Sequence, residues 1–391
     1  MIDRIDDPAR FQALNAEWDE LLKASSADSP FLTWEWLWSW WKHLAADGTL
    51  HILAFRDRDR LVAIAPLMSR TLRVAGLAPV RVLEFLGTGS VGSDYLDLIV
   101  RRGQEAEALG AFADYLAKGD VALEMAQLDA NAAVARTLAA ELTHRGWNVS
   151  ATNTHVCPFI DLSGHTWSSY LATLGSAHRY NFQRRLKNAT KRFDLRFAEA
   201  RSSEERREAL ACLVSLHQRR WQGRGGSDGL HTPALLAFHE EVSQLALARG
   251  WLRLFVLSLD GRPAAALYGF RYGPVFYFYQ SGFDPTYSQY SVGLITMGLA
   301  IQHALAEGAA EYDLLHGDEA YKFQWARTTR ALCRLEVYPP HPREVLYRRT
   351  RQASRALRRT ARRLLPVAVA DRISAARRLG VWKGFYADWR S

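Results

Sequence analysis

The chain has 391 residues, of which 48% are hydrophobic and 12% aromatic, so it can bury the cores of two domains and is not generally disordered. Its three cysteines, Cys157, Cys212 and Cys333, are scattered without C-x-x-C spacing, which argues against a disulfide framework and against a zinc site. The first residues, Met1–Arg4, do not begin a signal peptide, and no run of about 18 apolar residues is present. We therefore expect a cytoplasmic protein without a bound metal.

The net charge of +9 is concentrated at the end of the chain. Residues 341–391 hold 14 Lys and Arg against three acidic residues, so the rest of the chain is nearly neutral. We predict a basic helical tail over this range, with arginines on all its sides. Such a helix attracts the anionic surface of a membrane or a nucleic acid, which makes the tail a candidate for peripheral contact with the inner membrane.

Hydrophobic periodicity predicts alternating helices and strands in the first half, which we place at residues 1–154. The expected helices are Pro8–Lys23, Trp34–Leu44, Gln104–Lys118 and Ala132–Arg145, and the expected strands are His51–Phe55, Leu61–Met68, Arg81–Leu86, Tyr95–Val100, Val121–Leu128 and Trp147–Thr152. The second of these helices holds five tryptophans. Their rings either pack in a core or line a groove for a sugar or an acyl chain.

A glycine-rich loop, residues 87–94, leads into an expected strand and not into a helix. Because a helix N-terminus is a common seat for phosphate, we expect the first half not to hold a phosphate-bearing ligand. Asp94 and Tyr95 end this loop. They either face a groove between the two halves and contact a substrate there, or cap a turn and pack in the strand.

The second half, which we place at residues 155–340, begins with helices and continues as a run of strands. The expected helices are Thr166–Leu174, His178–Arg192, Glu204–Trp221, Pro233–Arg249 and Ser291–Glu307, and the expected strands are Leu252–Leu259, Ala264–Tyr272, Val275–Ser281, Glu311–Leu315 and Ala331–Tyr338. Turn signals separate the first three strands, Asp260-Gly261 and Gly273-Pro274. Because the first half has a similar order of elements, we expect a tandem arrangement.

A short sequence joins the third of these strands to the following helix: Gln289, Tyr290, Ser291, Val292 and Gly293. The first backbone N–H groups of a helix lack intrahelical partners and favour an anion. Ser291 is the expected N-cap, and Gly293 leaves room for a ligand at the backbone. The alternative is an ordinary cap followed by a close packing point between helices.

A basic face marks the helix expected at His178–Arg192. Its Arg and Lys residues lie opposite an apolar stripe, which indicates either a solvated face or a grip on an anionic substrate. Arg179 and Arg184 are the candidates for substrate binding.

Polar residues follow the strand Glu311–Leu315 in the order His316, Gly317, Asp318, Glu319. Group transfer to an amine or a hydroxyl needs a base that takes the acceptor's proton. Asp318 and His316, at the outgoing end of the strand, are the candidates. In the alternative reading, Asp313 and Asp318 bind backbone groups and pair with nearby cations.

The residues Asp313–Glu319, followed by Tyr321, Lys322 and Trp325, resemble the signature of the CelD/BcsL-type, BioF-like acetyltransferases. That family belongs to the GNAT superfamily and is related to the FemAB/FemX aminoacyl transferases. The resemblance extends to three supporting segments, Pro30–Leu32, Gly92–Asp97 and Arg179–Leu186, and so covers roughly residues 10–338.

The resemblance implies an α+β fold of tandem GNAT-like domains, each a mixed twisted sheet flanked by helices. It also implies acetyl-CoA or another acyl-CoA as co-substrate, with its pyrophosphate at Gln289, Ser291, Val292 and Gly293. Tyr321 matches the position from which GNAT enzymes protonate the CoA thiolate. By the same resemblance, Lys322 would neutralise a phosphate or the oxyanion.

Three functions follow as hypotheses. The first is a CoA-dependent N- or O-acetyltransferase acting on a small-molecule or carbohydrate acceptor, a precursor of cell-envelope or exopolysaccharide; the acceptor class comes from the resemblance alone. The second is FemX-like transfer from aminoacyl-tRNA. The third is a non-catalytic, membrane-associated partner of a polysaccharide synthesis complex.

Overall fold

The computed structural model describes residues 1–46, 48–72, 79–119, 121–222 and 230–340. The basic tail expected at 341–391 lies outside them. The α+β prediction is confirmed: within the described chain, helices flank an antiparallel sheet of four strands and a mixed sheet of eleven. No helix among the described residues combines the length and the apolar character needed to cross a membrane.

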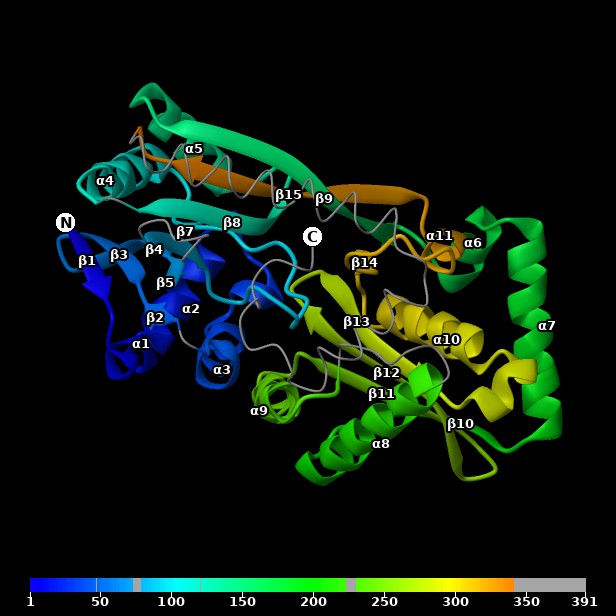
Figure 1. Ribbon diagram of the computed structural model, residues 1–391. Coiled ribbons are helices and arrows are strands. Elements are labelled where there is room, and N and C mark those ends of the chain that lie inside the picture. The colour runs from blue at the N-terminus through cyan, green and yellow to red at the C-terminus, as the bar shows by residue number, and fades with distance from the viewer. Residues whose placement is uncertain (47, 73–78, 120, 223–229, 341–391) are drawn as a thin grey trace, which may run out of the picture.

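The second half contributes five neighbouring strands to the larger sheet: β10 (Leu195–Glu199), β11 (Leu252–Leu259), β12 (Arg262–Tyr272), β13 (Val275–Phe283) and β14 (Glu311–Asp313). Alternate side chains of a strand face opposite sides of a sheet. Along β12, Tyr268 and Phe270 pack in a core with α8 (Ser203–Gln222) and α9 (Pro233–Ala248), whereas Leu267 packs with α10 (Val292–Ala306). The strands therefore lie between two layers of helices (Figure 1).

Three further helices complete the second half: α6 (Trp167–Thr173), α7 (Ser176–Arg192) and the short α11 (Lys322–Trp325). Phe182 of α7 sits against Trp167 and Trp325, and it closely approaches Gly298 of α10. This packing fixes α7 across the helix that follows the junction predicted to bind phosphate.

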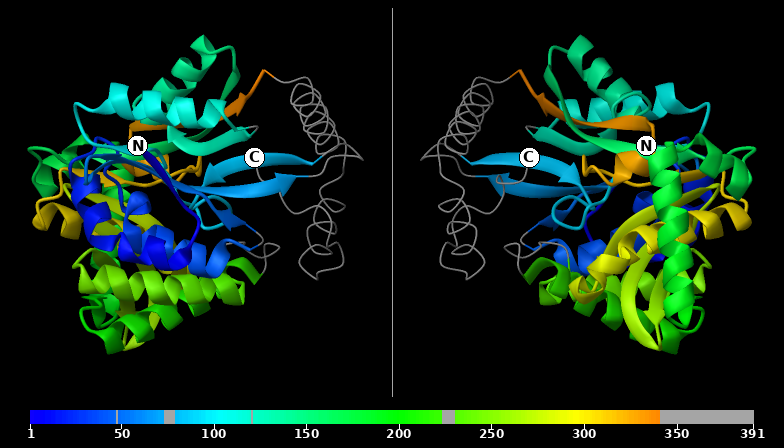
Figure 2. Two further views of the ribbon diagram at one scale, coloured as in Figure 1. Left: turned by 90° about the vertical axis from the view of Figure 1, so that its left-hand side faces the viewer. Right: turned by 90° about the vertical axis from the view of Figure 1, so that its right-hand side faces the viewer.

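The first half supplies the small sheet, in the order β1 (Ile2–Ile5), β3 (Ile52–Asp57), β4 (Arg60–Ala65) and β7 (Ile99–Val100). Its other strands, β2 (Thr49–Leu50), β5 (Leu67–Leu72), β6 (Val80–Phe85) and β8 (Ala122–Asp129), join the large sheet. Its helices are α1 (Pro8–Ala13), α2 (Asn15–Lys23), α3 (Trp34–Leu44), α4 (Glu105–Ala117) and α5 (Val134–His144). Figure 2 shows β5 and β6, in blue, extending to the side where β15 (Thr328–Tyr338) also ends.

The expected strand Tyr95–Val100 was wrong in its first part, because only Ile99 and Val100 are paired. Tyr95 has a φ of 55°, and the backbone N–H of Leu98 bonds to the side chain of Asp97. The positive φ and the local hydrogen bond both interrupt an extended ladder. The loop consequently continues as far as residue 98.

Two long strands tie the halves together. The strand β9 (Asn148–Asp161) pairs with β14 at one end, and the last described strand, β15, lies between β9 and β8. The boundary expected at residues 154 and 155 falls inside β9. One sheet therefore runs from β10 of the second half to β2 of the first.

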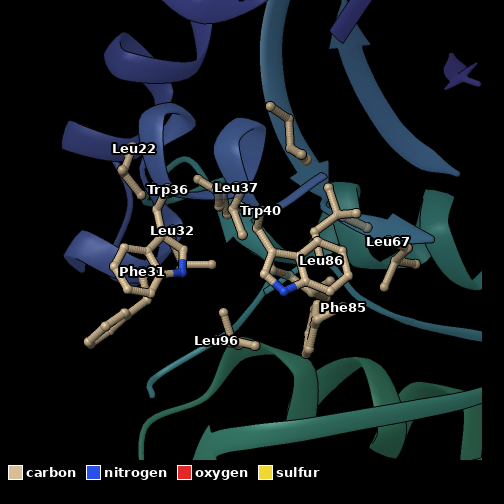
Figure 3. Packing of buried hydrophobic residues seen from close by; sticks show 14 of the residues in the cluster. Leu22, Phe31, Leu32, Trp36, Leu37, Trp40, Leu67, Phe85, Leu86 and Leu96 are labelled. Atoms are coloured by element: carbon tan, nitrogen blue, oxygen red, sulfur yellow. The ribbon is translucent and has the colours of Figure 1, made fainter. Parts of the chain in front are cut away.

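Three of the five tryptophans of α3, Trp34, Trp36 and Trp40, are core residues, and Trp38 and Trp41 pack half-buried against the same core. Trp36 and Trp40 are each 1% exposed and lie among leucines and phenylalanines (Figure 3), and the rings of Trp34 and Trp38 stack at 5.5 Å. The buried indoles also donate hydrogen bonds: Trp36 Nε1 to Ser93 Oγ over 2.9 Å, and Trp40 Nε1 to the carbonyl of Thr88 over 3.1 Å. The helix thereby anchors the glycine-rich loop.

Candidate functional site

A gap opens between β13 and β14. The two strands pair in parallel for three residues, as far as Tyr277 and Asp313, and then separate. Beyond this point the N–H of Leu314 bonds to the carbonyl of Pro158 in β9 over 2.9 Å, which draws the chain away from β13. In β13 the register with β12 jumps from Phe278 to Gln280. Tyr279 is thus an extra, bulged residue at the gap, a feature that often re-aims groups beside active sites.

A cavity of about 210 Å³ lies at this gap. Its walls come from β13, the loop after β14, the start of α11, α9 and the glycine-rich loop of the first half. The lining residues are Ser90, Val91, Gly92, Leu230, His239, Phe278, Tyr279, Gln280, Leu314, Leu315, His316, Glu319, Tyr321 and Lys322. Three of the four residues predicted to be catalytic therefore meet in one cavity to which both halves contribute.

His316 is held by Asp94 of the first half. Its backbone N–H donates to Asp94 Oδ2 over 2.8 Å, and its ring Nδ1 lies 2.8 Å from Oδ1 and 3.0 Å from Oδ2. The Asp94 carboxylate raises the pKa of His316 above its ordinary value of 6.5, against the opposing effect of burial. Asp94 itself is 0% exposed and does not line the cavity, so its contact there is with His316.

The loop that carries Asp94 is fixed at several points. Besides the two bonds from the α3 tryptophans, the Tyr279 hydroxyl donates to the carbonyl of Val91. Gln127 Nε2 donates to Asp94 Oδ1 over 3.1 Å. A carboxylate held in this way keeps a defined position relative to the cavity.

Lys322 has a different surrounding from the one predicted. Its side chain is 5% exposed, and its ammonium donates to the carbonyls of Leu315 and His316 and lies 3.1 Å from Glu319. These three partners account for its three N–H donors. Leu315 has a left-handed φ of 55°, so the lysine fastens an unusual turn that aims His316 at the cavity.

Tyr321 and Asp318 differ in their access to the cavity. Tyr321 lines it, and burial raises the pKa of its hydroxyl, so the group keeps its proton. Asp318 is exposed and is not among the lining residues. Of the two predicted bases, His316 alone is placed at the cavity.

A buried ion cluster lies behind the gap. Tyr95 OH donates to Asp313 Oδ2 over 2.7 Å, and Arg330 of β15 donates to Asp313 over 3.2 Å and to Glu311. Burial raises the pKa of Asp313 to about 7, while these donors and the N–H of Leu315 oppose the rise. Tyr95 is therefore a link between the halves and does not line the cavity.

The junction before α10 departs from the expectation in one respect. Ser291 does not cap the helix: its φ is 57°, its N–H closes the preceding turn (Pro285–Tyr290) on Ser288, and no cap hydrogen bond is made by its side chain. The helix begins at Val292, which is fully buried, and a Cβ at Gly293 would meet only the Phe283 ring at 3.6 Å.

Positive charge from α7 lies beside this junction. Arg185 Nη1 donates to the carbonyl of Gln289 over 2.6 Å, and the Arg192 guanidinium sits 5.5 Å from the centre of the Tyr290 ring. The arginines that the sequence analysis chose on this helix, Arg179 and Arg184, do not make these contacts. Arg179 bonds to carbonyls at the end of α6, and Arg184 to Asn181 of its own helix.

Among the described residues, neither residues 289–293 nor Arg179 and Arg184 line the cavity. The structure thus shows two separate features. One is the cavity at the gap between β13 and β14, and the other is the N-terminus of α10 with the arginines of α7 beside it.

Sequence reasoning missed His239 and Tyr279. His239 lies on the apolar face of α9, and burial lowers its pKa to about 3, so it is neutral. Its Nε2 is 3.5 Å from the Tyr279 hydroxyl. His239 could have been noticed as a histidine within the apolar stripe of a helix. The bulge at Tyr279 could not, because nothing in the residue pattern indicates it.

Comparison with known proteins supports the fold. Residues 176–323 match the acetyltransferase (GNAT) domain family, whereas no curated protein matches the chain. The crystal structure of FemX is similar with a TM-score of 0.58 and 11% identity, covering 82% of this chain and 95% of that one. The C-terminal domain of a putative lysylphosphatidylglycerol synthetase from Agrobacterium fabrum is similar with a TM-score of 0.53 and 10% identity, covering 87% and 95%.

A third similar structure is L-PGS from Bacillus licheniformis, with a TM-score of 0.50 and 13% identity, covering 90% of this chain and 97% of that one. At these identities the likeness concerns the fold alone. The finer resemblance to the CelD/BcsL type is not reached by these comparisons and stays a prediction. Residues 176–323 thus match the acetyltransferase (GNAT) domain family, within a larger fold similar to that of FemX.

Proposed function

We propose that the protein is an acyl-CoA-dependent N- or O-acetyltransferase whose transfer step takes place in the cavity between β13 and β14. The observation that carries the proposal is the meeting of His316 and Tyr321 at the point where these strands separate. The GNAT family match supports the reaction class.

The cavity offers the groups that acyl transfer requires. The acceptor's amine or hydroxyl attacks the thioester carbonyl, and Nε2 of His316 takes the acceptor's proton. As the C–S bond breaks, Tyr321 gives its proton to the leaving thiolate. Its raised pKa means that the hydroxyl is protonated at neutral pH, so the proton is present when the thiolate leaves. The backbone N–H of the bulged Tyr279 is the candidate donor to the oxyanion.

The donor's size calls for a second binding region. A cavity of about 210 Å³ is smaller than the usual volume of a ligand pocket, so it holds only the reacting end of the donor. We assign the donor phosphates to the N-terminus of α10, where helix amides and the positive charge of Arg185 lie together. The Nε of Arg185 is buried and lacks a hydrogen-bond partner within the described chain.

The acceptor that we propose is a carbohydrate precursor of the cell envelope or of an exopolysaccharide. This choice follows the CelD/BcsL resemblance, and the amphipathic cavity suits a sugar hydroxyl or amine. The similarity to FemX makes aminoacyl-tRNA the alternative donor, and the exposed basic face of α7 supplies the charge that it would need.

Isothermal titration of the purified full chain distinguishes the donors. We expect saturable one-site binding of acetyl-CoA, weaker binding of CoA lacking the 3′-phosphate, and release of CoA thiol when amino sugars or nucleotide sugars are added. Binding of charged tRNA together with no binding of acetyl-CoA would establish the alternative. Binding of neither donor would favour the non-catalytic partner and overturn the proposal.

A further inference from the structure

Most of the hydrogen bonds that the carboxylate of Asp94 makes are to His316. Oδ2 accepts from the backbone N–H of His316, both oxygens lie within 3.0 Å of His316 Nδ1, and Oδ1 also accepts from Gln127. Asp94 is 0% exposed and is absent from the cavity lining. A substrate therefore has no direct access to the carboxylate, which excludes the substrate-binding role that the sequence predicted for it.

We propose that Asp94 is the positioning residue of His316, so that the catalytic base and the carboxylate that orients it come from different halves of the chain. This inference rests on the proposed function, because it assigns His316 the role of base. With an ionised carboxylate at Nδ1, neutral His316 carries its proton on Nδ1. The lone pair on Nε2 then faces outward, where it can accept a proton.

The position of the ring supports this assignment. The His316 side chain is 34% exposed, and its Cε1, which adjoins Nε2, lies beside Gly92 of the cavity wall. Within the described residues, Nε2 makes no hydrogen bond, although Nδ1 and the backbone N–H are both bonded. The ring is fixed on one side and open on the other, as an acceptor for a substrate proton requires.

Several charged or titratable groups surround the ring. The loop of the first half contributes Asp94, β9 contributes His155 with its ring 5.2 Å away, and the segment after β14 contributes Glu319 and Lys322. Lys322 opposes protonation of His316, whereas Glu319 favours it. Asp94 has the largest effect, and its contact is direct.

Cys157 of β9 also lies beside Asp94, but it is not a candidate base or nucleophile. Its sulfur is 3.8 Å from Asp94 Oδ2, and burial together with the neighbouring carboxylates raises the pKa of its thiol. The thiol keeps its proton at neutral pH and is therefore a weak nucleophile. The chemistry of this corner is left to the histidine.

Two buried tryptophans of α3 hold the loop that carries Asp94. Trp36 donates to Ser93, one residue before Asp94, and Trp40 donates to Thr88, six residues before it. A small displacement of a catalytic group costs much of the rate. The tryptophan-rich helix thus sets the position of the carboxylate that in turn sets His316.

The test begins with the wild-type protein and needs no substrate. Two-bond ¹H–¹⁵N correlation spectra of ¹⁵N-histidine-labelled protein, assigned with His316→Gln, report the tautomer and the titration of His316. We expect the Nδ1–H tautomer and a pKa above 6.5. A pKa at or below 6.5, or the Nε2–H tautomer, would overturn the proposal.

Asp94→Asn then removes the charge at nearly constant volume. We expect the pKa of His316 to fall and the tautomer to shift toward Nε2–H, because the new amide donates to Nδ1. The matched control is Asp318→Asn, an exposed carboxylate of the same corner, for which we expect neither change. Thermal unfolding of each variant verifies that it is folded. If Asp94→Asn does not fold, the tautomer and pKa of His316 in the wild-type spectrum still test the proposal.

Steady-state kinetics test whether the Asp94–His316 contact matters for acetyl transfer. Asp94→Asn should lower kcat by about 10²-fold with acetyl-CoA affinity unchanged, and should move the acid limb of the pH profile to lower pH. Equal kcat in Asp94→Asn and wild type would overturn the positioning role. If the spectra behave as expected but the wild type transfers no acetyl group, the proposed function fails while the Asp94–His316 pair stands, so the two failures are distinguishable.

Discussion

The hydroxyl of Tyr95, in the first half, donates a hydrogen bond to the buried carboxylate of Asp313, at the end of β14, over 2.7 Å. Replacement of Tyr95 by Phe keeps the ring and removes the donor. We expect a loss of about 2 kcal/mol in the free energy of unfolding, because a charged and buried acceptor loses a partner. Urea titration measures it. Tyr180→Phe is the control, since Tyr180 is 66% exposed and its change should stay within about 0.5 kcal/mol.

Arg330→Met should make stability depend on pH. Met keeps an apolar stem over the Phe159 ring and leaves Asp313 without its cation. Burial raises the pKa of Asp313 from 3.8 to about 7. Between these two values the folded protein holds a proton that the unfolded chain has lost. The free energy of unfolding therefore falls as pH rises from 3.8 toward 7. Without Arg330 the pKa rises further.

The variant should therefore lose about 3 kcal/mol at pH 8 and clearly less at pH 5.5, relative to wild type at the same pH. Urea unfolding at both pH values gives the comparison. Arg327→Met, at an exposed neighbouring arginine, should show no such difference. An equal loss at pH 5.5 and pH 8 would mean that Asp313 does not titrate between them.

Two helical glycines should respond to alanine with opposite signs. A Cβ at Gly298 would lie 2.1 Å from Cε2 of the buried Phe182, so Gly298→Ala should destabilise the protein by about 1–3 kcal/mol through overpacking between α10 and α7. Gly110 of α4 has nothing within 4 Å of the same position, so Gly110→Ala should stabilise by about 0.5–1 kcal/mol. Thermal unfolding decides both, and a neutral Gly298→Ala would contradict the close approach of the two helices.

Gly293 separates helix stability from donor binding. An acidic residue in the first turn of a helix stabilises it by about 0.3–1 kcal/mol, but it would repel a phosphate bound there. We expect Gly293→Asp to unfold no more easily than Gly293→Asn and to bind acetyl-CoA at least about tenfold more weakly. Calorimetric titration of the two variants provides the measurement. Equal affinities would remove the donor phosphates from this helix end.

The order of strands and helices around β11 to β14 could be predicted, because period-two apolar runs separated by Gly and Asp turns indicate strands directly. His316 and Tyr321 could be placed at the end of a strand for the same reason. The strand Leu195–Glu199 was missed because it is short, carries the charged residues Arg196 and Glu199 and lies at an edge of the sheet.

The contact between Asp94 and His316 could not be predicted as a pair. The two residues are 222 positions apart, and their meeting depends on β9 and β15 crossing between the halves. Left-handed backbone at Ser291 and Leu315 was equally hidden, because neither residue type signals a positive φ. Local patterns indicated which groups have suitable chemistry, and long-range pairing decided which of them meet.

A crystal structure of the protein with a non-hydrolysable acetyl-CoA analogue would show where the acyl group and the phosphates bind. We expect the analogue's acyl carbon in the cavity between β13 and β14, close to Nε2 of His316 and the hydroxyl of Tyr321, with the phosphates at the start of α10. An analogue bound with its acyl group away from this cavity, or a cavity closed to it at saturating concentration, would contradict the account.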